Sequence, residues 1–116
     1  MTISSLTPLH DADFYRVMHA SHGPAIVFFT SAGCNSCRYW RQLLEQLVQA
    51  RTDLVVYVVD AGASMGLAQE YEVFHLPALF LFRDGHYHAP LQCEASLAAL
   101  TGTLDAALAQ PAQEAP

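Results

Sequence analysis

The chain has 116 residues, of which 53% are hydrophobic and 14% charged. This length fits one domain with a single core, and this composition excludes intrinsic disorder. Five arginines and no lysine stand against eleven acidic residues, for a net charge of −6; nucleic acid and anionic membrane surfaces are therefore not expected as partners, because both attract basic patches.

The beginning of the chain shows no pattern typical of export or membrane insertion. Its first basic residue is Arg16, whereas a signal peptide has a basic start followed by an apolar run. The longest wholly apolar stretch, residues 54–59, is far shorter than the roughly 20 residues that span a bilayer. The three cysteines, an odd number, do not form a disulfide scaffold. We therefore expect a cytoplasmic protein.

Two helices are expected in the first half of the chain. Asp11 can cap the first, which ends before Gly23 and Pro24. In the second, apolar residues recur at positions i, i+3, i+4, i+7 and i+8, starting at Trp40 and ending at Val48.

Short apolar runs rich in β-branched and aromatic residues predict strands buried on both faces, over residues 25–29, 54–59 and 78–82. The first two strands flank the long helix and are therefore expected to be parallel, as in a βαβ unit. Asp84 and Gly85 predict a tight turn into an edge strand over 86–91. A last helix is expected over 94–109.

The predicted order is helix, strand, helix, strand, helix, strand, strand, helix. It indicates an α/β fold, a four-stranded mixed sheet covered by helices, and leaves open a short fifth strand near the N-terminus. Residues 1–110 form the expected domain, and residues 111–116 are expected to be a flexible tail.

Cys34 and Cys37 lie where the first strand turns into the long helix. Residues three apart at a helix start are neighbours, so their sulfurs can form a disulfide with little backbone movement. Unpaired N–H groups and the helix dipole favour a thiolate at Cys34, while Cys37 is better shielded. This asymmetry predicts that Cys34 attacks a substrate disulfide and that Cys37 resolves the mixed disulfide.

Two other interpretations of the cysteine pair stay open. Cys93 and His75 would complete four ligands with Cys34 and Cys37 for zinc or an iron–sulfur cluster, although the chain has no second C-x-x-C. A buried, inert pair is disfavoured, because a strand-to-helix turn is exposed and electropositive.

Two segments of the chain resemble the thioredoxin family. Residues 28–38, Phe-Phe-Thr-Ser-Ala-Gly-Cys-Asn-Ser-Cys-Arg, look like the family's active-site segment. Residues 73–85, Val-Phe-His-Leu-Pro-Ala-Leu-Phe-Leu-Phe-Arg-Asp-Gly, are similar to its segment around a cis-proline. The resemblance implies a thioredoxin-like fold, a cis Leu76–Pro77 bond beside the cysteines, and substrate binding at Gly33, Leu76 and Pro77.

The chain also departs from the family pattern. Asn35 and Ser36 replace the usual Gly-Pro, and Gly33 replaces the Trp that commonly precedes the first cysteine. Phe28 stands where the family has a buried acid that takes the proton of the resolving thiol, and the lysine partner of that acid is missing too. We hypothesise that water or His75 replaces the acid, since an imidazole titrates near pH 6.5; the alternative is a solvated loop histidine.

Cys93 follows the edge strand, near a loop that borders the substrate groove in the family. It is a regulatory thiol, a dimer-forming thiol, a metal ligand or, as we favour, a small half-buried filler. The remaining histidines are expected to be solvated: His10, His19, His22, His86 and His88.

These features predict a thiol–disulfide oxidoreductase that reduces protein disulfides through Cys34 and Cys37 and serves cell redox homeostasis. We expect a monomer that receives electrons from a reductase or another dithiol protein, and no cofactor is implied. Part of the apolar content is expected to form a weakly charged docking surface around residues 33 and 76–78. The alternatives are a binding or assembly module with a regulatory or vestigial C-x-x-C, and a metal-binding variant; a glutaredoxin-like activity is disfavoured because no Gly-Gly follows the proline strand.

Overall fold

The computed structural model describes residues 6–116, so residues 1–5 of the expected domain lie outside the described part. In chain order the elements are β1 (Thr7–Pro8), α1 (Phe14–His19), β2 (Pro24–Thr30), α2 (Asn35–Ala50), β3 (Val55–Asp60), α3 (Met65–Glu70), β4 (Ala78–Arg83), β5 (His86–Pro90) and α4 (Leu97–Leu108). This order confirms the predicted one and adds the short strand β1 that the sequence left open.

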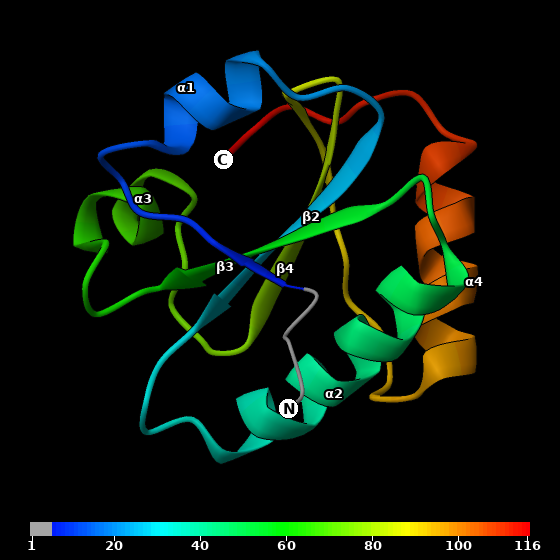
Figure 1. Cartoon of the computed structure of the whole chain (residues 1–116), viewed down its shortest axis with the longest axis horizontal. Coiled ribbons are helices and arrows are strands. Elements are labelled where there is room, and N and C mark those ends of the chain that lie inside the picture. The colour runs from blue at the N-terminus through cyan, green and yellow to red at the C-terminus, as the bar shows by residue number, and fades with distance from the viewer. Residues whose placement is uncertain (1–5) are drawn as a thin grey trace.

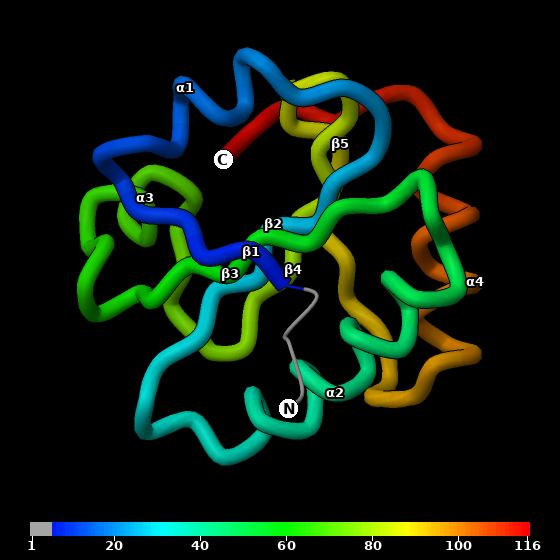
Figure 2. Tube along the Cα trace, viewed as in Figure 1, coloured from blue at the N-terminus to red at the C-terminus, as the bar shows by residue number. Residues whose placement is uncertain are grey.

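The strands form one mixed sheet in the order β1-β3-β2-β4-β5 (Figures 1 and 2). Strands β1, β3 and β2 are parallel, whereas β4 is antiparallel to both β2 and β5. The expected parallel pairing of the strands that flank α2 is therefore confirmed.

The sheet separates two apolar cores. One core packs β2, β3 and β4 against α2 and α4, and the other packs the opposite face against α1 and α3. Successive strand residues point to opposite faces, which explains why β2 is continuously apolar: Ile26 and Phe28 belong to the first core, Val27 and Phe29 to the second. Figure 1 shows the two helix pairs on either side of the sheet.

The two terminal helices begin later than the sequence predicted. The N-cap residue of α1 is Asp13 and not Asp11, and the Asp13 carboxylate accepts the N–H of His10 at 2.8 Å rather than an N–H group of the helix. Asp11 lies before the cap, and its backbone N–H donates to Ser64 Oγ. Helix α4 does not begin at residue 94, because Ser96 Oγ accepts the Ala99 N–H at 3.1 Å and caps the helix there.

The prediction that His88 is solvated is wrong. Its side chain is only 6% exposed, and Nε2 lies 2.8 Å from the carbonyl oxygen of Ala107 and 3.0 Å from that of Gln110. Carbonyl oxygens only accept, so Nε2 carries the hydrogen and donates to both. The Ala107 carbonyl also accepts the backbone N–H of Gln110 at 3.2 Å, so His88 adds a second kind of partner at the end of α4 and binds the Gln110 carbonyl just beyond it.

The C-terminal segment lies beside β5. The backbone N–H of Gln113 donates to the His88 carbonyl oxygen at 2.7 Å. Figure 2 shows this segment leaving α4 and running back across the molecule. The expected mobility of residues 111–116 stays a prediction.

The predicted hairpin turn is confirmed. Asp84 and Gly85 connect β4 to β5 and both have a positive φ, 53° and 80°, as the tight turns that join antiparallel strands require. In addition, none of the helices within residues 6–116 combines the length and the apolarity that crossing a bilayer demands.

Candidate active site

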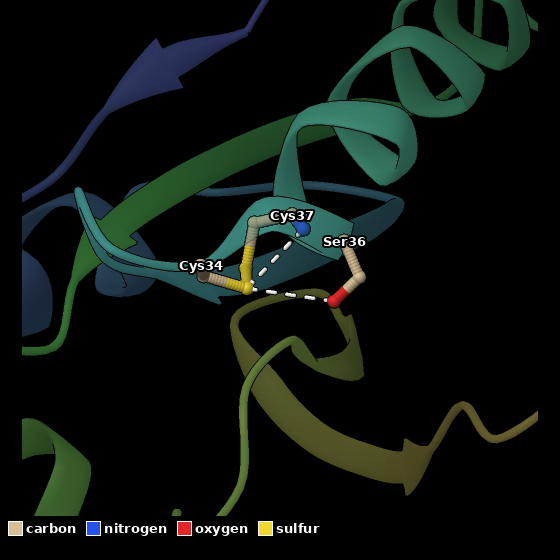
Figure 3. The surroundings of a disulfide bond; sticks show 3 residues. All are labelled: Cys34, Ser36 and Cys37. Atoms are coloured by element: carbon tan, nitrogen blue, oxygen red, sulfur yellow. Dashed lines mark hydrogen bonds between the residues drawn. A yellow bond between two sulfur atoms is a disulfide. The ribbon is translucent and has the colours of Figure 1, made fainter.

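Cys34 and Cys37 form a disulfide at the start of α2, directly after the loop that follows β2 (Figure 3). Their Cα atoms are 5.3 Å apart, as is common for bridged cysteines. Cys34 is the N-cap residue of α2, and its Sγ accepts the backbone N–H of Cys37 at 3.2 Å. The sulfur therefore takes the place of the oxygen that usually satisfies a free N–H group at a helix start.

The two sulfurs differ in accessibility. Cys37 is 3% exposed and belongs to the core between the sheet, α2 and α4, whereas Cys34 is half-buried at the surface of that core. Cys34 is therefore the more accessible of the two sulfurs. The roles of Cys34 as attacking thiol and Cys37 as resolving thiol stay predictions.

Ser36 lies beside the disulfide. From the sequence it was only a departure from the family pattern, with no expected contact to the sulfurs. Its Oγ lies 3.6 Å from Cys34 Sγ (Figure 3). Because the disulfide sulfur carries no hydrogen, the Ser36 hydroxyl is the donor. A side-chain hydroxyl at this position offers the sulfur a second hydrogen-bond partner, which a proline would not provide.

The loop between α3 and β4 meets the disulfide at an open hollow of about 640 Å³. Cys34, Gly33, His75 and Leu76 all line it, so the structure brings these candidate residues together. A Cβ atom placed on Gly33 would meet nothing within 4 Å, which leaves that side of Cys34 uncovered. His75 is exposed, and its role in proton transfer stays a prediction.

Pro77 and Ala78 line a second hollow of about 420 Å³, which shares Phe74 and His75 with the first. The Leu76–Pro77 peptide bond is cis. The candidate substrate-binding residues are thus divided between two adjoining depressions of one surface.

Phe74 is a member of this surface that sequence reasoning missed. It is 81% exposed, the highest value among the exposed large apolar residues between positions 6 and 116. Its sequence position could have indicated this exposure. Phe74 lies in the loop before Pro77, where no neighbouring strand or helix pattern requires an apolar side chain.

Two arginines share another hollow with the disulfide. A hollow of about 160 Å³ is lined by Thr30, Ser31, Ala32, Cys34, Cys37, Arg38 and Arg41. Arg41 lies four residues after Cys37 and seven after Cys34, so these three residues share one face of α2.

Phe28 is fully buried, in the same core as Cys37. It pairs with Val58 on β3 and with Leu79 on β4, at the centre of the sheet. An apolar ring therefore occupies the position where the resemblance led us to look for an acid.

Cys93 is a free, half-buried thiol that packs against the core containing Cys37. This packing supports the interpretation of Cys93 as a small apolar filler. Between residues 6 and 116 no three His, Cys, Asp or Glu side chains gather closely enough to hold a metal ion, so the four-ligand site with His75 gains no support.

Known proteins resemble the chain over most of its length. The family profile described as Thioredoxin matches residues 5–106. The chain belongs to the thioredoxin family. A thioredoxin of Mycobacterium tuberculosis is 31% identical over 83 residues, which cover 71% of this chain and 72% of that protein. The oxidized form of mitochondrial thioredoxin 3 from Saccharomyces cerevisiae superposes with a TM-score of 0.75, at 26% identity, over 87% of this chain and 95% of that one.

A third relative is named as a bifunctional protein. The bifunctional thioredoxin reductase/thioredoxin of Mycobacterium leprae is 29% identical over 76 residues, which cover 65% of this chain and 17% of that protein. Membership of the thioredoxin family, together with the Cys34–Cys37 pair, supports thiol–disulfide oxidoreductase activity.

Proposed function

We propose that this thioredoxin-family protein acts in the cytosol as a monomeric reductant of protein disulfides and so serves cell redox homeostasis. The observation that carries the proposal is the unequal pair of sulfurs: Cys34 caps α2 at the surface, and Cys37 lies behind it in the core. The helix start favours a thiolate at Cys34 once the disulfide is reduced.

The proposed reaction is a two-electron exchange in two steps. The Cys34 thiolate attacks one sulfur of the substrate disulfide, and the other substrate sulfur leaves as a thiolate that takes up a proton. Cys37 then loses its proton and attacks Cys34 Sγ, which releases the second substrate thiolate and forms the Cys34–Cys37 disulfide. The substrate is reduced and the protein is oxidised.

A new cycle needs two electrons from a dithiol donor. The Mycobacterium leprae relative carries a thioredoxin reductase in the same chain, which supports a reductase of this class as the donor here. Dithiothreitol replaces it in a purified assay.

Insulin reduction tests the proposal. The protein is expected to accelerate precipitation of the insulin B chain by dithiothreitol, and Cys34→Ser is expected to abolish the acceleration. Cys37→Ser is expected to retain the first step and to accumulate the mixed disulfide, visible as a mass adduct. Cys93→Ser is the matched control and is expected to leave the rate unchanged.

Two results would contradict the proposal. If the variant with serine at both 34 and 37 kept the biological activity and its bound partner, the chain would be a binding or assembly module. If the reduction potential of the Cys34–Cys37 pair lay well above about −220 mV, near the upper end of the cytosolic glutathione poise, the pair would act as an oxidant or isomerase.

A further inference from the structure

The two hollows that meet at Cys34 differ in their chemistry. One carries Arg38 and Arg41, and the other carries Phe74 and Leu76. Cys34 lines both. A peptide whose sulfur reaches Cys34 therefore meets two arginines in one hollow and, in the other, two apolar side chains beside the polar Asn35, Ser36 and His75.

Neither arginine is held by a carboxylate within residues 6–116, where the two ion pairs both belong to Arg51. The first turn of α2 contains no acidic residue. The helix start adds partial positive charge at the same place.

The nearest carboxylate in these hollows has other partners. Asp60 shares a neighbouring hollow of about 370 Å³ with Arg41. Its Oδ1 accepts the backbone N–H groups of Gly62 at 2.8 Å and Ala63 at 3.2 Å. The chain has a net charge of −6, yet two of its five arginines line a hollow together with the disulfide.

The other hollow presents an uncovered aromatic ring. Phe74 is 81% exposed at the rim of the hollow that Leu76 and His75 also line. Single exposed apolar residues are common on protein surfaces, but this ring lines the same hollow as Cys34. Contact with an apolar side chain would remove both groups from water.

We propose that the two hollows select the substrate: protein disulfides whose cysteine has a carboxylate side chain on one side along the peptide and a large apolar side chain on the other. This inference rests on the proposed reductase function. Arg38 and Arg41 bind the carboxylate, and Phe74 packs against the apolar side chain.

Peptides that carry one cysteine as a mixed disulfide with 2-thiopyridine test the selection. The Cys34 thiolate of the reduced protein attacks the peptide sulfur and displaces pyridine-2-thione, whose absorbance reports the second-order rate constant. Cys37 then releases the peptide thiol. The peptides form a set with Glu, Gln or Lys on one side of the cysteine and Leu or Ala on the other, made in both orders, and each rate is divided by the rate of the same peptide with dithiothreitol.

The wild-type protein is expected to prefer Glu over Gln about fivefold in one of the two peptide orders, since a single exposed ion pair contributes little and two arginines act together. The preference is expected to fall as salt rises. Replacing both Arg38→Gln and Arg41→Gln should bring the Glu-to-Gln ratio to about one, and Arg41→Glu should favour Lys. Arg16→Gln, on the exposed face of α1, is the matched control and should keep the wild-type ratio.

The preference for an apolar side chain is tested with the same set. The wild-type protein is expected to prefer Leu over Ala severalfold; Phe74→Ser should remove this preference and Phe74→Leu should retain it. Met65→Ser is the matched control, because Met65 is 62% exposed and lines none of the hollows described above.

Two failures are distinguishable. Equal normalised rates for all peptides with the wild-type protein would overturn the selection while leaving the reductase function intact. Failure to react with any of the peptides and with insulin would overturn the proposed function, and the selection with it.

Discussion

Cys34 and Cys37 are the same residue type three positions apart, and their surroundings alone make them different. Cys34 ends an extended stretch and caps α2, so its sulfur faces an N–H group and the surface. Cys37 lies within the first helical turn, against the core. The sequence predicted this difference because a helix start is a local feature, recognisable from the strand before it and the apolar periodicity after it.

His75 carries the prediction on proton transfer. His75→Ala is expected to change the pH dependence of insulin reduction and to lower the rate about tenfold or more, because a positioned acid–base group contributes roughly 10²–10⁴-fold. The steady-state assay at several pH values measures both effects. His86→Ala serves as the control, because His86 is an exposed histidine on β5. If His75→Ala left the pH dependence of the rate unchanged, water and not His75 would take the proton of the Cys37 thiol.

Tyr71 links the aromatic core to stability at alkaline pH. Burial raises the pKa of Tyr71, and the charge of Glu70 raises it further. As pH rises above about 10, the unfolded chain loses the phenolic proton while the native state keeps it. The stability that Tyr71 contributes is therefore complete below pH 10 and falls above it, by up to about 1.4 kcal/mol per pH unit, until the native state titrates as well.

Tyr71→Phe is expected to make the decline of unfolding free energy with pH less steep, as urea denaturation between about pH 8 and 11 would measure. Tyr39→Phe, at a position 50% exposed, should follow the wild-type curve. A parallel decline for Tyr71→Phe and the wild type would show that the Tyr71 hydroxyl titrates normally in the folded protein.

At the scale of elements, turn and cap residues set where helices and strands end. The hairpin between β4 and β5 also fixes a contact across the fold: the Asp84 N–H donates to the Gly23 carbonyl oxygen at 2.9 Å, and the Gly23 N–H donates to Asp84 Oδ1 at 2.7 Å. The turn therefore ties the hairpin to the start of β2.

Gly85→Ala is expected to destabilise the protein by about 1–3 kcal/mol. Its φ of 80° strains any residue with a Cβ, and a Cβ there would collide with the backbone carbonyl of Met18. Gly102→Ala is the matched control: Gly102 lies inside α4 with nothing within 4 Å of the added methyl, so we expect a gain of about 0.5–1 kcal/mol. Urea denaturation of the oxidised proteins measures both, and equal effects would contradict the turn argument.

At the scale of the whole molecule, the sheet lies between two cores that are made of hydrophobic side chains. Phe28 stands at the centre of one of them, fully buried between β3 and β4. The proton-handling pair expected for the family has no equivalent at this position, because both the acid and any lysine are missing.

Phe28→Asp is expected to cost more than about 3 kcal/mol, because it buries a carboxyl group without a partner. Burial would raise the pKa of that carboxyl above the unfolded value of about 4, so the loss of stability should grow as pH rises above 4. Phe28→Leu, which keeps the site apolar, is the control and should cost about 1–1.5 kcal/mol. Denaturation at pH 4 and pH 8 measures the difference; a variant as stable as Phe28→Leu at pH 8 would show that the core can host an ionised acid.

The sequence alone determined the order of elements, the hairpin at Asp84 and the position of the cysteine pair. Each of these follows from residues that are close together in the chain: apolar periodicity, turn residues with positive φ, and a three-residue spacing at a helix start. The tertiary structure decided which side chains from distant segments contact one another. It buried His88 against the end of α4, and it placed Phe74 from the loop before β4 in a hollow that Cys34 also lines. These contacts join segments far apart in the chain, and only the packing of helices and loops onto the sheet determines which side chains meet there.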